Sequence, residues 1–245
     1  MTETKNTPEY TFTTRLQPPP LTTSTTILYP TPENPDPATN DPVFSDGMRI
    51  RHAVFVEEQH CSAENEIDSD DERSWQWVIY ASKNTHSPGQ DESNRLESFP
   101  VGIIRLVPPP HAPHEALLQD TTSKNTNLPK YDFSHEPYVK ITRLAVLPDF
   151  RGHGLSKLLL RTAEDWARDN RGAINEMLRR VARDEGQEDQ GIKEWNGLVG
   201  LHAQVQVEEM YRRAGYETDH HLGTWYEEGI LHVGMFKRLR LEHKT

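Results

Sequence analysis

Hydrophobic residues recur along this chain with two periods, one typical of helices and the other of strands. A spacing near 3.6 predicts a helix, whereas short runs of β-branched and aromatic residues predict strands. Helices are expected at Asp46–Glu58, Leu155–Ala167 and Val207–Ala214. Strands are expected at Trp75–Ala81, Pro100–Val107, Tyr138–Val146, Leu198–Gln204, Thr218–Tyr226 and Ile230–Arg238. This order of elements predicts a mixed α/β sheet covered by helices.

Polar and proline-rich segments precede and interrupt these elements. Nine of the 18 prolines lie in the first 42 residues, so residues 1–45 are expected to form an irregular arm with at most a short strand at Thr25–Tyr29. Residues 46–239 are expected to form a single domain, and residues 240–245 a tail. Polar insertions are expected near residues 82–99, 107–137 and 168–196, of which the third has helical spacing.

Composition narrows the possible classes of protein. Hydrophobic residues make up 34% of the chain, a low share that the polar segments account for. The net charge of −11 argues against a general nucleic-acid binder and against a binder of anionic membranes. No apolar run approaches the roughly 20 residues that span a bilayer. The single cysteine, Cys61, excludes an internal disulfide. With no apolar signal core at the start, a cytoplasmic protein is expected.

A glycine-bearing turn joins the strand that ends at Val146 to the helix predicted from Leu155. Glycine lets the backbone come close to a ligand, and the first amides of a helix point outward with no partner. A turn of this kind suits a phosphate or pyrophosphate. The glycine patterns of dinucleotide-binding loops and of P-loops are both absent. The residues of the turn are Arg151, Gly152, His153, Gly154, Leu155 and Ser156.

The pattern R-x-x-G-x-S in this turn resembles the coenzyme A loop of the GCN5-related N-acetyltransferase superfamily, usually written [QR]-x-x-G-x-[GA]. Ser156 departs from the small apolar residue at the last position. Downstream, Tyr211 and Gly215-Tyr216 resemble the strand-then-helix segment of that superfamily, and Gln204 stands about where many members have asparagine. The segments RHAVFVEEQHCSAENEIDSDDE and YEEGILHVGM resemble the ElaA-like branch.

The resemblance implies a fold, a cofactor and a reaction. The expected fold is a mixed sheet in which two parallel strands splay apart, with the pantetheine arm of acetyl-CoA in the gap. The resemblance also implies that the backbone of Leu144, Ala145 and Val146 pairs with this arm, beside Gln204 and Tyr211. The expected activity is N-acetyl transfer to a primary amine, without a metal ion. A homodimer is an expectation by analogy alone.

Acyl transfer from a thioester requires a neutral amine, stabilisation of the carbonyl oxygen and a proton for the leaving thiolate. The resemblance makes Tyr211 the candidate acid, although the ring could also be a core aromatic. The candidates for the base are Glu58, Glu66, Asp68, His202 and His232. The acidic residues from Glu57 to Glu72 suggest a negatively charged mouth that attracts a cationic amine. The expected substrate-binding residues are Glu58, Glu66, Asp68, Trp225 and Tyr226.

Three functions remain open from the sequence. The first is acetylation of a small amine such as an amino sugar, the second is acetylation of protein lysines or N-termini, and the third is a non-catalytic sensor that binds coenzyme A. Neither nucleic acid nor a membrane is an expected partner. The histidines of the proline-rich insertion lack metal-ligand spacing and are expected to face solvent: His111, His114 and His135.

Overall fold

The computed structural model describes residues 10–22, 26–83, 98–116, 128–187 and 191–241. In this part of the chain a single sheet runs in the order β1-β2-β3-β4-β5-β8-β6, and β7 pairs with β8. The strands are β1 Tyr10–Gln17, β2 Trp75–Lys83, β3 Ser98–Val107, β4 Val139–Val146, β5 Leu198–Gln204, β6 Glu217–Thr218, β7 Thr224–Glu227 and β8 Ile230–Arg238. The helices are α1 Pro42–Arg51, α2 Leu155–Asp169, α3 Arg171–Asp184 and α4 Glu208–Arg213.

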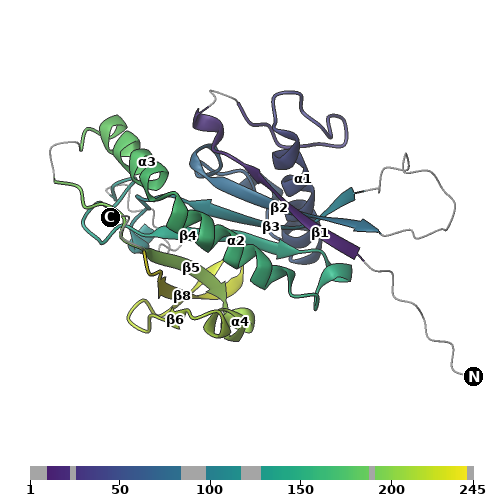
Figure 1. Ribbon diagram of the computed structural model, residues 1–245. Coiled ribbons are helices and arrows are strands. Elements are labelled where there is room, and N and C mark those ends of the chain that lie inside the picture. The colour runs from purple at the N-terminus through teal and green to yellow at the C-terminus, as the bar shows by residue number, and fades with distance from the viewer. Residues whose placement is uncertain (1–9, 23–25, 84–97, 117–127, 188–190, 242–245) are drawn as a thin grey trace, which may run out of the picture.

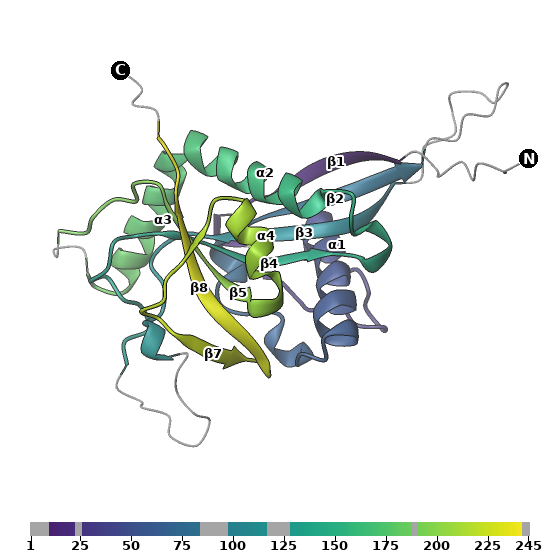
Figure 2. The same ribbon diagram turned by 90° about the horizontal axis from the view of Figure 1, so that it is seen from below.

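Helices cover both faces of the sheet, as Figures 1 and 2 show, with α2 on one side and α1 on the other. The alternation of side chains along β2 explains both layers, because successive residues of a strand point to opposite faces. Trp77 and Ile79 belong to the larger core, which contains α2 and α3. Val78 and Tyr80 belong to the smaller core under α1. The predicted mixed α/β sheet with flanking helices is therefore confirmed.

Most predicted elements are present with small changes of boundary. The first helix begins at Pro42 rather than Asp46, because the Asp41 carboxylate accepts a hydrogen bond from the Val43 amide at 2.8 Å and Pro42 occupies the first turn. It continues as a π-helical segment, His52–Glu58. The charged segment after α2 forms α3, as its helical spacing predicted.

Two strand predictions are wrong. The arm contributes the edge strand β1, which pairs antiparallel with β2, while residues 26–29 form no strand. The alternation YTFTTRLQ is typical of a strand and places Tyr10 and Phe12 against the large core. The many prolines that follow favour irregular chain instead, and they led to the wrong expectation for this segment. The single strand expected at Thr218–Tyr226 is divided by a turn into β6 and β7, each paired with β8.

The parallel strands β4 and β5 separate part-way along their length. They pair only where Val139–Ile141 lies beside Val199–Leu201. The register of β4 against β3 also shifts between Ile103 and Arg105, and the adjacent Arg143 has a φ of 52°. Such an irregularity bends a strand. Within the described residues, the edge of β4 that faces β5 consequently pairs with no strand beyond Ile141, which is the expected splay.

The insertions are described only in part. Residues 84–97 and 117–127 lie outside the described residues, as do residues 242–245 of the expected tail. The proline-rich insertion after β3 is fastened by the buried Arg73, whose guanidinium donates to the carbonyls of Pro108 and Pro110 at 2.7 and 2.8 Å. In the described ranges, no helix is both long enough and apolar enough to cross a membrane.

Candidate functional site

The glycine turn between β4 and α2 has the geometry of an anion-binding loop. Gly152 and Gly154 have φ values of 79° and 75°, in the left-handed region that favours glycine. A Cβ added at either position would meet no atom within 4 Å, so the space above the loop is open. Gly154 is the N-cap of α2, and no side chain in the described part of the structure caps the helix. The first amides of α2 therefore remain available to an anionic ligand.

Arg151 connects this loop to the π-helical segment on the other side of the sheet. Its guanidinium donates to both carboxylate oxygens of Glu58, at 2.8 and 2.6 Å, and to the carbonyl of Val146 at 3.0 Å. The hydrogen bond from Arg151 lowers the pKa of Glu58. A carboxylate held in this way is a weaker proton acceptor, so the geometry disfavours Glu58 as a general base and indicates that it fastens the loop.

Tyr211 lies on α4, with its ring buried in the large core beside Tyr216 at a centroid distance of 6.0 Å. Burial raises the pKa of the Tyr211 phenol well above its usual range. The hydroxyl is therefore protonated at neutral pH, as a general acid must be. The ring also packs as a core aromatic, so both interpretations of the sequence fit its position.

His202 and Glu227 form a hydrogen-bonded pair beside the splay. His202 Nδ1 donates to Glu227 Oε1 at 2.6 Å, and Trp225 Nε1 donates to the same oxygen at 2.6 Å. Burial, together with the charge of Lys140, lowers the pKa of His202 to about 4. The imidazole is consequently neutral at pH 7, and with its proton on Nδ1 it presents Nε2 as a proton acceptor.

Glu66 and Asp68 do not form the negatively charged mouth that the sequence predicts. Glu66 Oε2 lies 3.1 Å from Arg51 Nε and 3.4 Å from Arg143 Nε. Both oxygens of Asp68 accept from Arg105, at 2.7 and 2.8 Å. Burial alone would raise the pKa of Asp68, but the charge of Arg105 holds it well below its usual range. These carboxylates are thus neutralised inside an ion-pair network rather than offered to an approaching amine.

Trp225 and Tyr226, both expected to bind the substrate, have different surroundings. Trp225 is buried between His202 and His114, with ring centroids 4.9 and 4.8 Å away. Tyr226 is 68% exposed, because neighbouring residues of a strand point to opposite faces. Trp225 is therefore the one of the two that packs against His202, and substrate binding by Tyr226 stays a prediction.

The remaining predicted residues lie on β5 and β8. Gln204 Nε2 donates to Gln59 Oε1 at 2.8 Å, which ties the end of β5 to the end of the π-helical segment. His232 is buried, and its Nδ1 contacts the Ile230 carbonyl at 2.8 Å. Its candidacy as the base stays a prediction, although among the described residues no carboxylate pairs with it as Glu227 pairs with His202.

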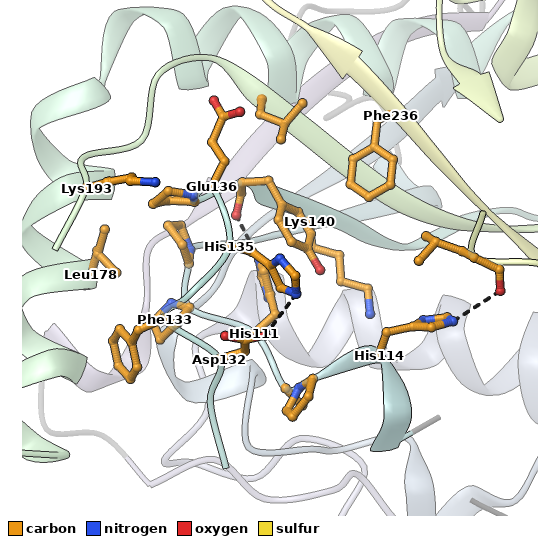
Figure 3. Close-up of a pocket in the computed structure, with 18 of the residues that line it drawn as sticks. His111, His114, Asp132, Phe133, His135, Glu136, Lys140, Leu178, Lys193 and Phe236 are labelled. Carbon is orange, nitrogen blue, oxygen red and sulfur yellow. Dashed lines mark hydrogen bonds and ion pairs between the residues drawn. The ribbon is translucent and has the colours of Figure 1, made fainter. Parts of the chain in front are cut away.

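A pocket of about 400 Å³ lies beside His202, under the proline-rich insertion (Figure 3). Its walls come from the insertion, from the start of β4 and from β8 and the turn that precedes β7. His111 is buried there and donates through Nε2 to the Tyr138 carbonyl at 2.8 Å, so its expected exposure is wrong. His114 Nε2 contacts the Leu222 carbonyl at 3.3 Å. His135 has an exposed side chain, as expected.

Sequence reasoning missed two residues that the fold brings to this region. Lys140 is one of two cations, with Arg143, in the otherwise largely apolar strand pattern YVKITRLAV, and Glu227 is the first acidic residue of the YEEG turn. A cation within an apolar strand indicates a special environment, so the sequence offered a reason to select Lys140. The pairing of Glu227 with His202 depends on strand pairing, which the sequence does not show. Over the described ranges, no cluster of three or more His, Cys, Asp or Glu side chains could hold a metal ion.

A comparison with family models matches residues 51–187 to the acetyltransferase (GNAT) family, which is more than half of the chain. The chain belongs to this family. The mixed sheet, with parallel β4 and β5 and flanking helices, is accordingly the GNAT fold. The match begins at the end of α1 and includes the glycine loop and α2 of this GNAT protein.

Solved structures resemble this GNAT protein at low sequence identity. A protein from Lactobacillus plantarum assigned as an N-acetyltransferase is 20% identical, with a TM-score of 0.49 and coverage of 94% of this chain and 99% of that one. ElaA from Escherichia coli is 17% identical, with a TM-score of 0.45 and coverage of 80% and 90%. An acyl-CoA N-acyltransferase from Pseudomonas aeruginosa is 19% identical, with a TM-score of 0.44 and coverage of 79% and 89%.

Proposed function

We propose that this GNAT protein transfers an acetyl group from acetyl-CoA to a primary amine of a small molecule, such as an amino sugar, within a ternary complex. The observation that carries the proposal is the separation of β4 from β5 beyond Ile141, next to the open glycine loop at the start of α2. The splay would receive the extended acyl-pantetheine arm, and the amides of the loop would bind the pyrophosphate.

The cofactor half of the proposed site follows from the backbone. The amides that follow Gly154, at Leu155 and Ser156, would contact the pyrophosphate, with His153 beside them. Beyond Ile141 the edge of β4 pairs with no strand in the described residues, although the Val146 carbonyl accepts from Arg151. This edge at Leu144, Ala145 and Val146 would pair with the pantetheine arm, and an N–H group there would stabilise the thioester oxyanion.

The chemical step is a direct attack by the acceptor amine. Its nitrogen forms a bond to the thioester carbonyl carbon, the carbon–sulfur bond breaks, and coenzyme A leaves as a thiolate. In the proposal, His202 Nε2 accepts the proton that the nitrogen loses, while Glu227 keeps the imidazole in the required tautomer. The Tyr211 hydroxyl supplies the proton that the thiolate gains.

A bridge across the acceptor side supports a small substrate over a protein chain. Glu228, in the turn between β7 and β8, accepts hydrogen bonds from the Ser62 amide at 3.1 Å and from Asn65 Nδ2 at 2.7 Å. An extended peptide laid across this side would have to break both bonds. A small amine could instead enter through the pocket beneath the insertion.

The deciding experiment measures thiol release from acetyl-CoA with a panel of small amines and, separately, with lysine-containing and free N-terminal peptides. Turnover with small amines and not with peptides is expected. Turnover with peptides alone would establish the protein acetyltransferase, and tight acetyl-CoA binding without any turnover would establish the sensor.

The variant Tyr211→Phe tests the proposed general acid. In the proposed enzyme, this change removes the acid and lowers kcat about 100-fold, because a positioned proton donor contributes on the order of 10²–10⁴. The KM for acetyl-CoA is expected to change little. A variant with unchanged kcat would remove Tyr211 from the mechanism.

A further inference from the structure

We propose that the pocket beneath the proline-rich insertion binds an anionic group of the acceptor, a carboxylate or a phosphate within a few bonds of the amine, with Lys140 as its counter-ion. This inference rests on the proposed function and deepens it, since it names the chemical class of the acceptor. It also replaces the cationic-substrate expectation, whose carboxylates are already neutralised by arginines.

Lys140 is a cation without a direct partner on the pocket wall. In the described part of the chain, its ammonium makes no hydrogen bond and no ion pair. The two carboxylates that act on it most strongly are engaged elsewhere, since Asp70 accepts from Arg73 at 2.7 Å and Glu227 accepts from His202 at 2.6 Å. Burial lowers the pKa of Lys140, which shows how poorly the site solvates the ammonium.

The wall of the same pocket carries a second hydrogen-bond donor. Tyr138 lines the same pocket, and residues i and i+2 of an extended segment point to the same face. Within the described residues its hydroxyl has no hydrogen-bond partner, and burial raises the pKa of the phenol to about 12, so it is a donor at neutral pH. The bare Gly200 makes room for this ring, because a Cβ there would lie 2.8 Å from Tyr138 Cδ2.

The carboxylates of the pocket wall have donors of their own. Asp132 accepts from the Ser134 amide and hydroxyl, both at 2.7 Å, and Asp219 accepts from the His221 amide at 2.9 Å. Glu136 binds Arg238 through both oxygens. In the described part of the chain, the lining donors left without a partner of their own include Lys140 and the Tyr138 hydroxyl, and Lys193 adds a second cation to the wall. Figure 3 shows the Lys140 side chain extending into the pocket between His111 and His114.

The position of Lys140 relative to His202 limits how far the anion of the acceptor can lie from its amine. Lys140 pairs with Gly200 across the parallel strands, and His202 follows on the same face of β5. An acceptor whose anion contacts Lys140 can thus bring a nearby amine to His202. Leu178, Leu222 and Phe236 add apolar walls for the rest of the molecule. Amino acids and amino phosphates have this arrangement of groups.

The experiment compares acceptors in matched pairs that differ only in the anion: phenylalanine with phenylalaninamide, and glucosamine 6-phosphate with glucosamine. Thiol release from acetyl-CoA gives kcat/KM for each. A preference of at least tenfold for one anionic member is expected, and a preference for the phosphate or for the carboxylate identifies the group. Neutral members that are used equally well or better would overturn the inference while leaving the proposed function intact. No thiol release with any amine would instead defeat the proposed function.

The variant Lys140→Met tests the residue itself. It is expected to raise KM for the preferred anionic acceptor at least tenfold, with unchanged KM for its neutral partner and for acetyl-CoA. The exposed Lys130, which lies outside the pocket lining, gives the matched control Lys130→Met with no change. An equal rise for neutral and anionic acceptors would overturn the assignment.

Binding of reaction products provides a readout that needs no turnover. Titration calorimetry with N-acetylphenylalanine, N-acetylglucosamine 6-phosphate and their neutral counterparts is expected to show at least tenfold tighter binding of an anionic product, lost in Lys140→Met. If Lys140→Met fails to fold, Lys140→Gln takes its place in both measurements. Equal binding of charged and neutral products by the wild-type protein would refute the inference.

Discussion

His202 and Glu227 lie 25 residues apart in the chain and meet at 2.6 Å because β5 and β7 both pair with β8. The pair makes a simple prediction for catalysis. His202→Gln and Glu227→Gln should each lower kcat about 100-fold, since one removes the proton acceptor and the other its orientation. The double variant should lose little more than either single variant, because the two groups act as a unit.

Steady-state kinetics of the three variants check this prediction, with the exposed His221→Gln as the control. Additive losses would show that the two side chains act independently. The acidic side of the kcat/KM profile should follow the pKa of the acceptor amine, because His202 is already neutral well below neutral pH.

Arg51 gives a second prediction at the scale of one residue. Its side chain is fully buried and pairs with both Glu66 and Asp71. Arg51→Met leaves two buried carboxylates short of a partner and should destabilise the fold by about 3–5 kcal/mol. Arg49→Met removes an exposed cation two residues away and should cost less than about 1 kcal/mol. Urea unfolding measures the free energy of unfolding of both variants. Similar losses of stability would contradict the conclusion that the buried arginine matters more than the exposed one.

At the scale of elements, the loop before α2 and the turn after α3 offer a matched pair of glycines. Gly154 and Gly186 both have positive φ, and neither would place a Cβ near another atom. Alanine at either position should destabilise the protein by about 1 kcal/mol, since both force a side chain into the left-handed region. Only Gly154 lies at the proposed pyrophosphate site.

Calorimetric titration with acetyl-CoA therefore distinguishes the two glycines. Gly154→Trp should abolish binding by filling the space over the α2 amides, whereas Gly186→Trp should bind like the wild type. Equal affinities in the two variants would place the pyrophosphate somewhere other than this loop.

The strands also show where the sequence pattern predicts an element correctly and where it does not. The strand Leu198–Gln204 and the strand Ile230–Arg238 were predicted with their observed bounds, because both carry dense apolar patterns in the core. β1 was missed because an edge strand buries little, so its pattern is weak beside the prolines that follow. Its existence depends on pairing with β2.

At the scale of the whole molecule, buried neutral histidine makes stability depend on pH. The pKa of His202 falls from 6.5 to about 4 on folding, first because of burial. The unfolded chain then binds more protons than the folded one between these values. Stability should be fully present above about pH 6.5 and fall as the pH drops toward 4, by about 3 kcal/mol from this group.

Thermal unfolding at a series of pH values from 7.5 to 4 measures this loss of stability. The His202→Gln variant should lose less stability over the same range, so its slope of stability against pH should be smaller. Part of the slope should remain in the variant, because burial also lowers the pKa of His111 well below its ordinary value. An unchanged slope in His202→Gln would show that His202 is not held neutral by the fold.

The sequence by itself determined the α/β layers, the glycine loop and the family, because apolar periodicity and short loop motifs are local properties of a chain. The tertiary structure alone decided which charges are free. It turned Glu66 and Asp68 into partners of buried arginines, joined His202 to Glu227 and, within the described residues, left Lys140 in the pocket without a direct ion pair. The physical reason is that the effect of a charge depends on its burial and its neighbours, and both are set by strand pairing between residues far apart in the chain.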